Sequence, residues 1–381
     1  MKCKICDSRK IYPLFNGTQY QKTGVYSLKK TKKKIIQIRI LFCKECYFIF
    51  KKKNLKSNFS YSKINRNTEN QLPNYIDKII NSLNKLKLNK NSVILEVGSN
   101  DNTFLNKLCD NFNNLVGIEP STFLSKQKKN RKIKIFNNYL NKIVVKKIIN
   151  SFGKPKLIIS RHTLEHVEKI NHFMKNISLL LNNKDKLFLE VPDTDWLISK
   201  SFFHEIWDEH VNYFTKESIC NLAIKHKFKI LSVSRKRFRD TRNILIWLQK
   251  NDNEVNNKFF LKKNFFNYIK KSKNKWEVIK KLLLNKIKKS EKPIIGVGAG
   301  HNQLNFLNFT KSNKSINYLT DDDPFKNNKY VNLSRNIKII KSEKLSNFKK
   351  GTLLLTCFPF PNFHRKLKKN FKNLKTINPY D

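Results

Sequence analysis

The sequence predicts an α/β protein whose central part is a doubly wound parallel sheet. Between about residues 70 and 250, short apolar runs alternate with amphipathic helical patterns. This alternation is typical of parallel strands covered by helices on both faces. The strand runs are SVILEVG, NLVGIEP, KLIISRH and KLFLEVP, and the helical runs are YIDKIINSLNKL, TFLNKLCDNF and HFMKNISLLLN.

Changes in composition divide the chain into three predicted domains. Residues 1–60 hold two cysteine pairs, residues 61–250 hold the alternating α/β part, and residues 251–381 begin with a lysine-rich helical stretch. In the last part, PIIGVGAG, SINYLTDDD, IKII and TLLLTCF repeat the α/β rhythm on a smaller scale. At 381 residues the chain is also too long for a single hydrophobic core, which favours several domains.

The formal net charge of +51 has two interpretations. Clustered lysines would indicate a nucleic-acid partner, and the charge together with the cysteine pairs keeps a zinc-ribbon nucleic-acid-binding protein as an alternative. Here, however, the lysines are spread along the whole chain beside abundant Asn and Ile. That pattern is typical of a coding sequence rich in A and T. We therefore expect lysine simply to fill solvated positions, with steering of anionic ligands as the lesser alternative, and we expect no specific nucleic-acid partner.

A membrane location is not expected from the sequence. No apolar run approaches the roughly 18 residues that a membrane helix needs. The first residues, MKCKICDSRK, lack the apolar stretch of a signal peptide. We therefore expect a cytoplasmic protein without a membrane partner.

Four of the seven cysteines form two CxxC pairs, Cys3 with Cys6 and Cys43 with Cys46. Each pair can bind one edge of a tetrahedral Zn²⁺, and four thiolates complete the coordination. Disulfides are disfavoured in a reducing cytosol, and a redox-active CxxC needs only one pair. The pattern predicts a structural zinc site, in which no ligand position is left for catalysis.

The stretch ILEVGSNDNTFL predicts a ligand-binding loop. Glu96 and Gly98 end a buried strand, and a helical pattern starts five residues after Gly98. Such a loop directs backbone N–H groups and a helix N-terminus at a ligand. Asn100 and Asn102 stand where glycine is common, and asparagine tolerates positive φ better than other residues with a side chain. Glu119, at the end of the next strand, can accept hydrogen bonds from ribose hydroxyls.

The acid in the strand indicates which cofactor the loop binds. A carboxylate at Glu96 would repel a pyrophosphate and would attract a cationic amino-acid group. Together with Glu119, it favours S-adenosylmethionine over NAD. The second loop, GVGAG at residues 296–300, is a weak signal that leaves a non-catalytic, NAD-binding protein as a further alternative.

These motifs resemble those of the sugar C-methyltransferases, which modify nucleotide-linked deoxyketosugars. ILEVGSNDNTFLNKL is similar to the ExGSNDG loop of that family, and GIEPS to its second acidic motif. The resemblance covers nearly the whole chain in the same order, including the cysteine pairs. Its other segments are RHTLEHVEKINHF, LFLEVPDTDWLISKSFFHEIWDEHVNYFT, GVGAGHNQLNFLN and INYLTDDDPFKNNKY.

The resemblance implies a class I S-adenosylmethionine-dependent methyltransferase core with an N-terminal zinc-binding domain and a C-terminal Rossmann-like domain. It implies a nucleotide-linked sugar as the small-molecule substrate. It also implies a cofactor site that comprises Glu96, Gly98, Ser99, Asp101 and Glu119, with Arg161 and His162 near the methyl donor.

The resemblance further implies that Glu209 and His210 lie beside the substrate, with the histidine as the base. Carbon becomes a good nucleophile when a base removes a proton next to a ketone, and a histidine with neighbouring carboxylates suits that task. Two departures stand out: Trp207-Asp208 replaces the usual Tyr-His, and Asn102 replaces the closing glycine of the loop. The first departure keeps O- or N-methyl transfer on the same scaffold as an alternative.

Overall fold

The computed structural model describes residues 1–22, 24–32, 34–52, 75–83, 86, 88–125, 130–238, 241–252, 260, 264–356 and 361–379. They form two compact units, which are described separately. The first unit contains Met1–Tyr12, Phe42–Trp196 and Val211–Lys263, and the second contains Pro13–Leu41, Leu197–His210 and Asn264–Asp381. The expected boundary at residues 60 and 61 lies outside the described residues.

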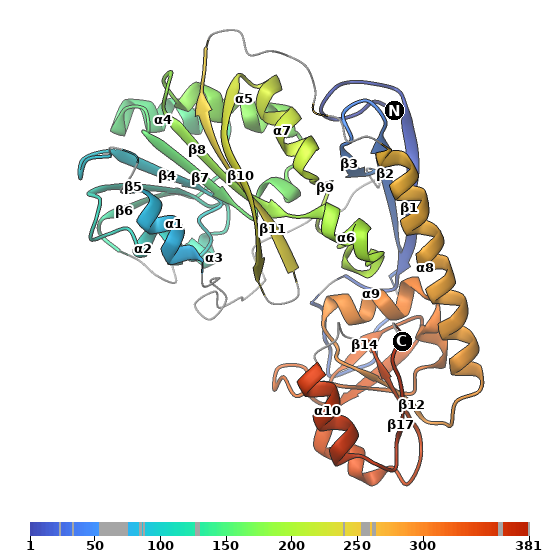
Figure 1. The fold of residues 1–381 in the computed structure, drawn as a ribbon. Coiled ribbons are helices and arrows are strands. Elements are labelled where there is room, and N and C mark those ends of the chain that lie inside the picture. The colour runs from blue at the N-terminus through green and yellow to red at the C-terminus, as the bar shows by residue number, and fades with distance from the viewer. Residues whose placement is uncertain are drawn as a thin grey trace. The chain divides into compact units, whose positions relative to one another are not determined.

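A seven-stranded sheet forms the centre of the first unit (Figure 1). Its strand order is β10-β11-β8-β7-β4-β5-β6, in which the five strands from β8 to β6 are parallel. The strand β11 runs antiparallel to β8 and forms a hairpin with β10. The strands are β4 (Val93–Val97), β5 (Asn114–Ile118), β6 (Ile133–Phe136), β7 (Leu157–Arg161), β8 (Lys186–Pro192), β10 (Phe228–Phe238) and β11 (Thr241–Lys250).

The predicted doubly wound sheet is confirmed, since each apolar run of the central part is a strand of this sheet. All five residues of β4 are buried, because helices cover both faces of a parallel sheet. Figure 1 shows α4, α5 and α7 on one face and α1 and α2 on the other. The helices of this unit are α1 (Ile76–Leu83), α2 (Thr103–Asn106), α3 (Thr122–Ser125), α4 (Lys142–Phe152), α5 (Ile170–Leu180), α6 (Thr194–Lys200) and α7 (Lys216–Lys225).

Local signals define where the long helices begin. The Asn141 side chain accepts hydrogen bonds from the backbone of Ile143 at 2.9 Å and Val144 at 3.0 Å, and so caps α4. Thr215 and Ser218 form a capping box at the start of α7. Each cap satisfies N–H groups that have no partner within the helix.

A smaller sheet has the strand order β1-β2-β3-β9. The strands β1 (Ile11–Gln19) and β2 (Ile36–Cys43) pass along the chain from one unit into the other. The strand β3 (Ile49–Lys51) pairs with β9 (Asn212–Tyr213), and both of these strands belong to the first unit. This β pairing joins the segment after the second cysteine pair to a later part of the same unit.

The second unit contains a six-stranded sheet of order β14-β15-β13-β12-β16-β17, as expected from the repeated α/β rhythm. All neighbouring strands in it are parallel except β14 and β15. Its strands are β12 (Ile294–Val297), β13 (Tyr318–Thr320), β14 (Tyr330–Asn332), β15 (Asn336–Ile340), β16 (Thr352–Leu355) and β17 (Lys375–Ile377). Its helices are α8 (Phe265–Lys288), α9 (His301–Phe309) and α10 (Pro361–Asn370).

The lysine-rich stretch before this sheet is the 24-residue helix α8. Its buried residues recur at intervals of three or four, so that one face is apolar while the lysines occupy the solvated face. These buried residues are Phe265, Ile269, Ser272, Trp276, Ile279, Leu283 and Ile287. Among the helices of the described residues, none combines the length and the apolar composition that crossing a bilayer requires.

Candidate cofactor and active site

The loop between β4 and α2 has the backbone that the sequence predicted. Gly98, Asn100 and Asn102 have φ values of 81°, 52° and 63°, so both asparagines adopt the left-handed conformation in place of glycine. Gly98 cannot be replaced in this way. A Cβ atom there would lie 2.1 Å from Oγ1 of Thr163, whose hydroxyl donates to the carbonyl of Val97.

Backbone hydrogen bonds join this loop to the neighbouring strand. The N–H groups of Gly98 and Ser99 both donate to the carbonyl of Ile118, the last residue of β5, at 2.8 and 3.2 Å. The carboxylate of Asp101 accepts from the N–H of Thr103 at 3.1 Å, at the first residue of α2. The predicted loop residues therefore lie at the carboxyl ends of two adjacent parallel strands, where ligands bind in open α/β sheets.

Glu119 completes the connection between the two strands. One oxygen of its carboxylate accepts from the N–H of Asn100 at 3.0 Å, and the other accepts from the N–H of Ser121 at 2.8 Å. Burial raises the pKa of Glu119, although these two N–H groups act in the opposite direction. Each oxygen retains a lone pair, so the carboxylate can still accept hydrogen bonds from two vicinal hydroxyls.

Glu96 is an acid inside a buried strand, with 3% of its surface exposed. Burial raises the pKa of Glu96 to about 8, against the opposing charge of Arg161. Its Oε2 atom has no hydrogen-bond partner among the described residues. The same holds for three other buried oxygens of the loop, namely Ser99 Oγ, Asn100 Oδ1 and Asn102 Oδ1. This excess of acceptors fits a ligand that supplies donors, such as an ammonium group and ribose hydroxyls.

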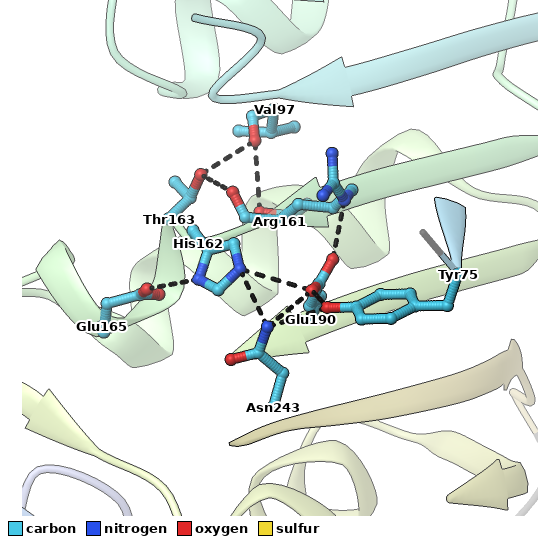
Figure 2. A network of polar contacts seen from close by, with 9 residues as sticks. Tyr75, Val97, Arg161, His162, Thr163, Glu165, Glu190 and Asn243 are labelled. Carbon is cyan, nitrogen blue, oxygen red and sulfur yellow. Dashed lines mark hydrogen bonds and ion pairs between the residues drawn. The ribbon is translucent and has the colours of Figure 1, made fainter. Parts of the chain in front are cut away.

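Arg161 ends β7 and His162 follows it, and both belong to a network around Glu190, which is fully buried in β8 (Figure 2). The Nε atom of Arg161 lies 2.7 Å from Oε2 of Glu190. Burial opposes ionisation of Glu190, but the charges of Arg161 and His162 outweigh it and lower the pKa of this carboxyl. The guanidinium group also lies 5.0 Å from the centre of the Phe104 ring, so it packs against α2.

The His162 ring lies between two carboxylates (Figure 2). Its Nε2 atom is 3.3 Å from Glu190 Oε1, and its Nδ1 atom is 3.4 Å from Glu165 Oε1. The His162 side chain is 42% exposed, so little desolvation opposes its protonation, and the two carboxylates raise the pKa of His162. The residue also has a φ of 47°, a conformation that costs energy for a residue with a side chain.

Four members of this network were not among the predicted site residues, namely Tyr75, Glu165, Glu190 and Asn243. The hydroxyl of Tyr75 donates to Glu190 Oε1, and the Nδ2 atom of Asn243 donates to the same oxygen at 2.9 Å. Glu190 could have been found, because it is an acid in the apolar run LFLEVP, as Glu96 is in its own strand. No sequence signal marked Tyr75 or Asn243.

All seven predicted cofactor residues lie in the first unit, at the ends of β4, β5 and β7. Glu209 and His210 belong to the second unit, and their place beside a substrate stays a prediction. Within that unit, the ring centre of Trp207 lies 5.0 Å from that of His210. Trp207 also stacks on His301, whose ring is nearly parallel with its centre 4.4 Å away.

The four N-terminal cysteines converge in the first unit. The Sγ atoms of Cys3 and Cys46 are 3.5 Å apart, as are those of Cys6 and Cys43, and all four lie within 4.8 Å of one another. Zinc bonded tetrahedrally to sulfur at about 2.3 Å requires sulfur atoms about 3.8 Å apart. The cluster therefore fits a four-thiolate zinc site.

The second unit repeats the construction of the cofactor loop after β12. Gly298 has a φ of 88°, and its N–H donates to the carbonyl of Thr320 at 2.7 Å. The N–H of Ala299 donates to Asp321 at 2.8 Å, as that of Asn100 does to Glu119. Here, however, Lys326 lies 3.0 Å from the same carboxylate oxygen of Asp321. The two loops share their backbone pattern but differ in the charge beside the acid.

Comparison with known proteins agrees with this geometry. Residues 68–233 match the profile of a family described as a methyltransferase domain. The C-methyltransferase NovU of Streptomyces niveus is 25% identical over 149 residues, which are 39% of this chain and 36% of NovU. The match thus spans about a third of the length of that curated relative.

Similar solved structures include two S-adenosylmethionine-dependent methyltransferases. The one from Clostridium acetobutylicum is 14% identical and covers 46% of this chain and 91% of its own, with a TM-score of 0.38. The one from Anabaena variabilis is 17% identical, and the match covers 48% of this chain and 89% of the other, with a TM-score of 0.37.

The sheet order, the glycine loop and the profile match together define the class of this part of the chain. It is a class I S-adenosylmethionine-dependent methyltransferase domain.

Replacing Gly98 by Ala is expected to damage the protein more than replacing Gly153 by Ala. Both glycines have positive φ, at 81° and 76°, but a Cβ at Gly153 meets nothing within 4 Å. Left-handed strain alone should lower the free energy of unfolding by about 1 kcal/mol at Gly153. The clash with Thr163 should add about 2–3 kcal/mol at Gly98. Urea unfolding of both variants measures the difference, and equal losses would contradict the tight approach seen here.

Proposed function

We propose that this protein transfers a methyl group from S-adenosylmethionine to a carbon atom of a nucleotide-linked keto-deoxysugar, through an enolate that His210 generates. The methyl donor is supported by the structure of the loop, above all by the buried carboxyl of Glu96 with its unpartnered oxygen. The sugar substrate is supported by the motif resemblance, and transfer to carbon is compatible with the similarity to NovU, which is called a C-methyltransferase.

The residues of the first unit would bind and orient the methyl donor, which supplies an electrophilic methyl group on a sulfonium. Glu96 would pair with its ammonium group, and Glu119 would accept hydrogen bonds from its ribose hydroxyls. Gly98 lets the backbone approach it closely. Because methyl transfer is an in-line displacement, this positioning supplies much of the rate.

His210 would remove a proton from the carbon next to the ketone, and Glu209 would orient its ring. The C–H bond breaks, its electron pair forms the enolate, and the proton moves to the imidazole nitrogen. The enolate carbon then bonds the methyl group while the bond between methyl and sulfur breaks.

An alternative is transfer to oxygen or nitrogen on the same scaffold. It is favoured by Trp207, which stands where the resembling family has tyrosine and stacks on His301 at 4.4 Å. That acceptor would not need an enolate. Exchange of the substrate C–H with solvent separates the two reactions.

Two measurements test the proposed function in sequence. The first is calorimetric titration of wild type and Glu119→Ala with S-adenosylhomocysteine, where we expect micromolar binding that the variant loses. The second is solvent deuterium exchange into thymidine diphosphate 4-keto-6-deoxyglucose with S-adenosylhomocysteine present. Wild type should catalyse the exchange, and His210→Asn should slow it by about 10²-fold or more. Methyl transfer without exchange would favour the alternative reaction.

The affinity for S-adenosylhomocysteine is expected to rise with pH. The pKa of Glu96 is raised to about 8, so below that pH the carboxyl is mostly protonated. It must lose this proton to pair with the ammonium group. Between about pH 6 and about pH 7.5 the dissociation constant should therefore fall by up to about tenfold per pH unit. Calorimetry at several pH values measures this slope, and Glu96→Gln should remove it. A slope that persists in the variant would assign the proton to another group.

We also propose that the four-cysteine cluster binds structural zinc. The purified protein should contain stoichiometric zinc by elemental analysis, and Cys43→Ser should lose it and unfold at a lower temperature. Cys109→Ser is the matched control, since this thiol is also buried in the first unit but lies outside the cluster. Retention of zinc by Cys43→Ser would refute the assignment.

A further inference from the structure

Glu165 presents a buried oxygen for which the described residues offer no hydrogen-bond partner. The residue is 1% exposed, and its Oε1 atom faces His162 Nδ1 at 3.4 Å. Its Oε2 atom is buried and makes no hydrogen bond within the described part of the chain. A buried carboxylate oxygen in this state is costly, and such groups in native proteins call for an explanation.

Glu165 follows a segment that contacts the methyl-donor loop. Thr163, two residues earlier, donates to the carbonyl of Val97 at 3.2 Å and sets the limit on side-chain size at Gly98. The short helical turn Leu164–His166 comes directly after. Glu165 is as deeply buried as Glu96 and Ser99, which are predicted to face the cofactor and are 3% and 4% exposed.

Several contacts fix this turn rigidly. The backbone carbonyl of Glu165 accepts from the N–H of Val211 at 2.8 Å. The Asn212 side chain donates to the carbonyls of Leu164 at 2.9 Å and Val167 at 2.7 Å. On the other side, the His162 ring is held by Glu190, which Tyr75 and Asn243 hold in turn (Figure 2). The Glu165 carboxylate is therefore pre-organised before any ligand arrives.

The charges around Glu165 indicate what kind of ligand it binds. Glu190 and Glu165 supply two negative charges, and Arg161 and the protonated His162 supply two positive charges. These four charges sum to zero, and a ring nitrogen of His166 also lies within 4.8 Å of a Glu165 carboxylate oxygen, so a donor without charge suffices here. What Oε2 lacks is a hydrogen-bond donor without charge, which is a hydroxyl or an N–H group.

We propose that Glu165 is a substrate-binding residue, which accepts a hydrogen bond through Oε2 from a hydroxyl or N–H group of the methyl acceptor. This inference rests on the proposed function and assigns Glu165 a part in selecting the methyl acceptor of that reaction. His162 is a positioning residue, because it acts on the acceptor only through Glu165.

The test compares Glu165→Gln with wild type and with Glu168→Gln, an exposed acid three residues further on. Both substitutions remove one negative charge and nearly preserve shape. S-adenosylhomocysteine is titrated first, and thymidine diphosphate 4-keto-6-deoxyglucose is then titrated at saturating S-adenosylhomocysteine. We expect Glu165→Gln to bind S-adenosylhomocysteine within about twofold of wild type and the keto-sugar at least about tenfold more weakly. Glu168→Gln should match wild type in both titrations.

Two results would overturn the inference. Unchanged keto-sugar binding by Glu165→Gln would mean that Oε2 is satisfied by an ordered water. Weakening of S-adenosylhomocysteine binding by about tenfold or more would place Glu165 in the methyl-donor site instead.

If wild type does not bind the keto-sugar, the proposed substrate is wrong, and the thermal midpoint of the ligand-free protein decides the case of Glu165. A midpoint of Glu165→Gln equal to or above that of wild type supports a binding role, since binding residues are often unfavourable for stability. A midpoint lower by more than about 4 °C makes the carboxylate structural and overturns the inference.

Discussion

The ion pair between Arg161 and Glu190 is the constraint on which the candidate site depends. Glu190 is fully buried, and a carboxylate in that position is tolerated because a guanidinium lies 2.7 Å away and other donors satisfy its second oxygen. Removing one partner of such a pair generally costs about 3–5 kcal/mol, because the other charge is left uncompensated. The same Arg161 packs on Phe104 of α2, so the pair also connects the loop helix to the sheet.

Sequence patterns predicted the elements that depend on local periodicity. The alternation of apolar runs and helical patterns predicted the strands β4, β5, β7 and β8 and the helices α1, α2 and α5 of the first unit. The left-handed conformations of Asn100 and Asn102 followed from the chemistry of asparagine, and the positions of Glu96 and Glu119 followed from the ends of their strands. These features are encoded within a few residues of chain.

The partners of Glu190 could not be predicted in the same way. Tyr75 precedes α1 and Asn243 lies in β11, and they meet because β11 inserts beside β8 as an antiparallel strand. The apolar runs predicted from the sequence did not include β11, and its pairing with β8 is set by contacts between distant parts of the chain. The grouping of Leu197–His210 with the second unit is likewise set by contacts between distant parts of the chain.

The two glycine loops have a consequence for how such motifs work. After β12, as after β4, a carboxylate at the end of the adjacent strand accepts a hydrogen bond from a loop N–H. At Asp321, however, a lysine lies beside the carboxylate. The carboxylate therefore stabilises the turn itself, whatever the loop binds. Glu119 accepts hydrogen bonds from two N–H groups, so removing its side chain destabilises the turn and also removes a ligand contact. The ligand of such a loop can then change through substitutions beside the carboxylate, while the carboxylate itself is retained.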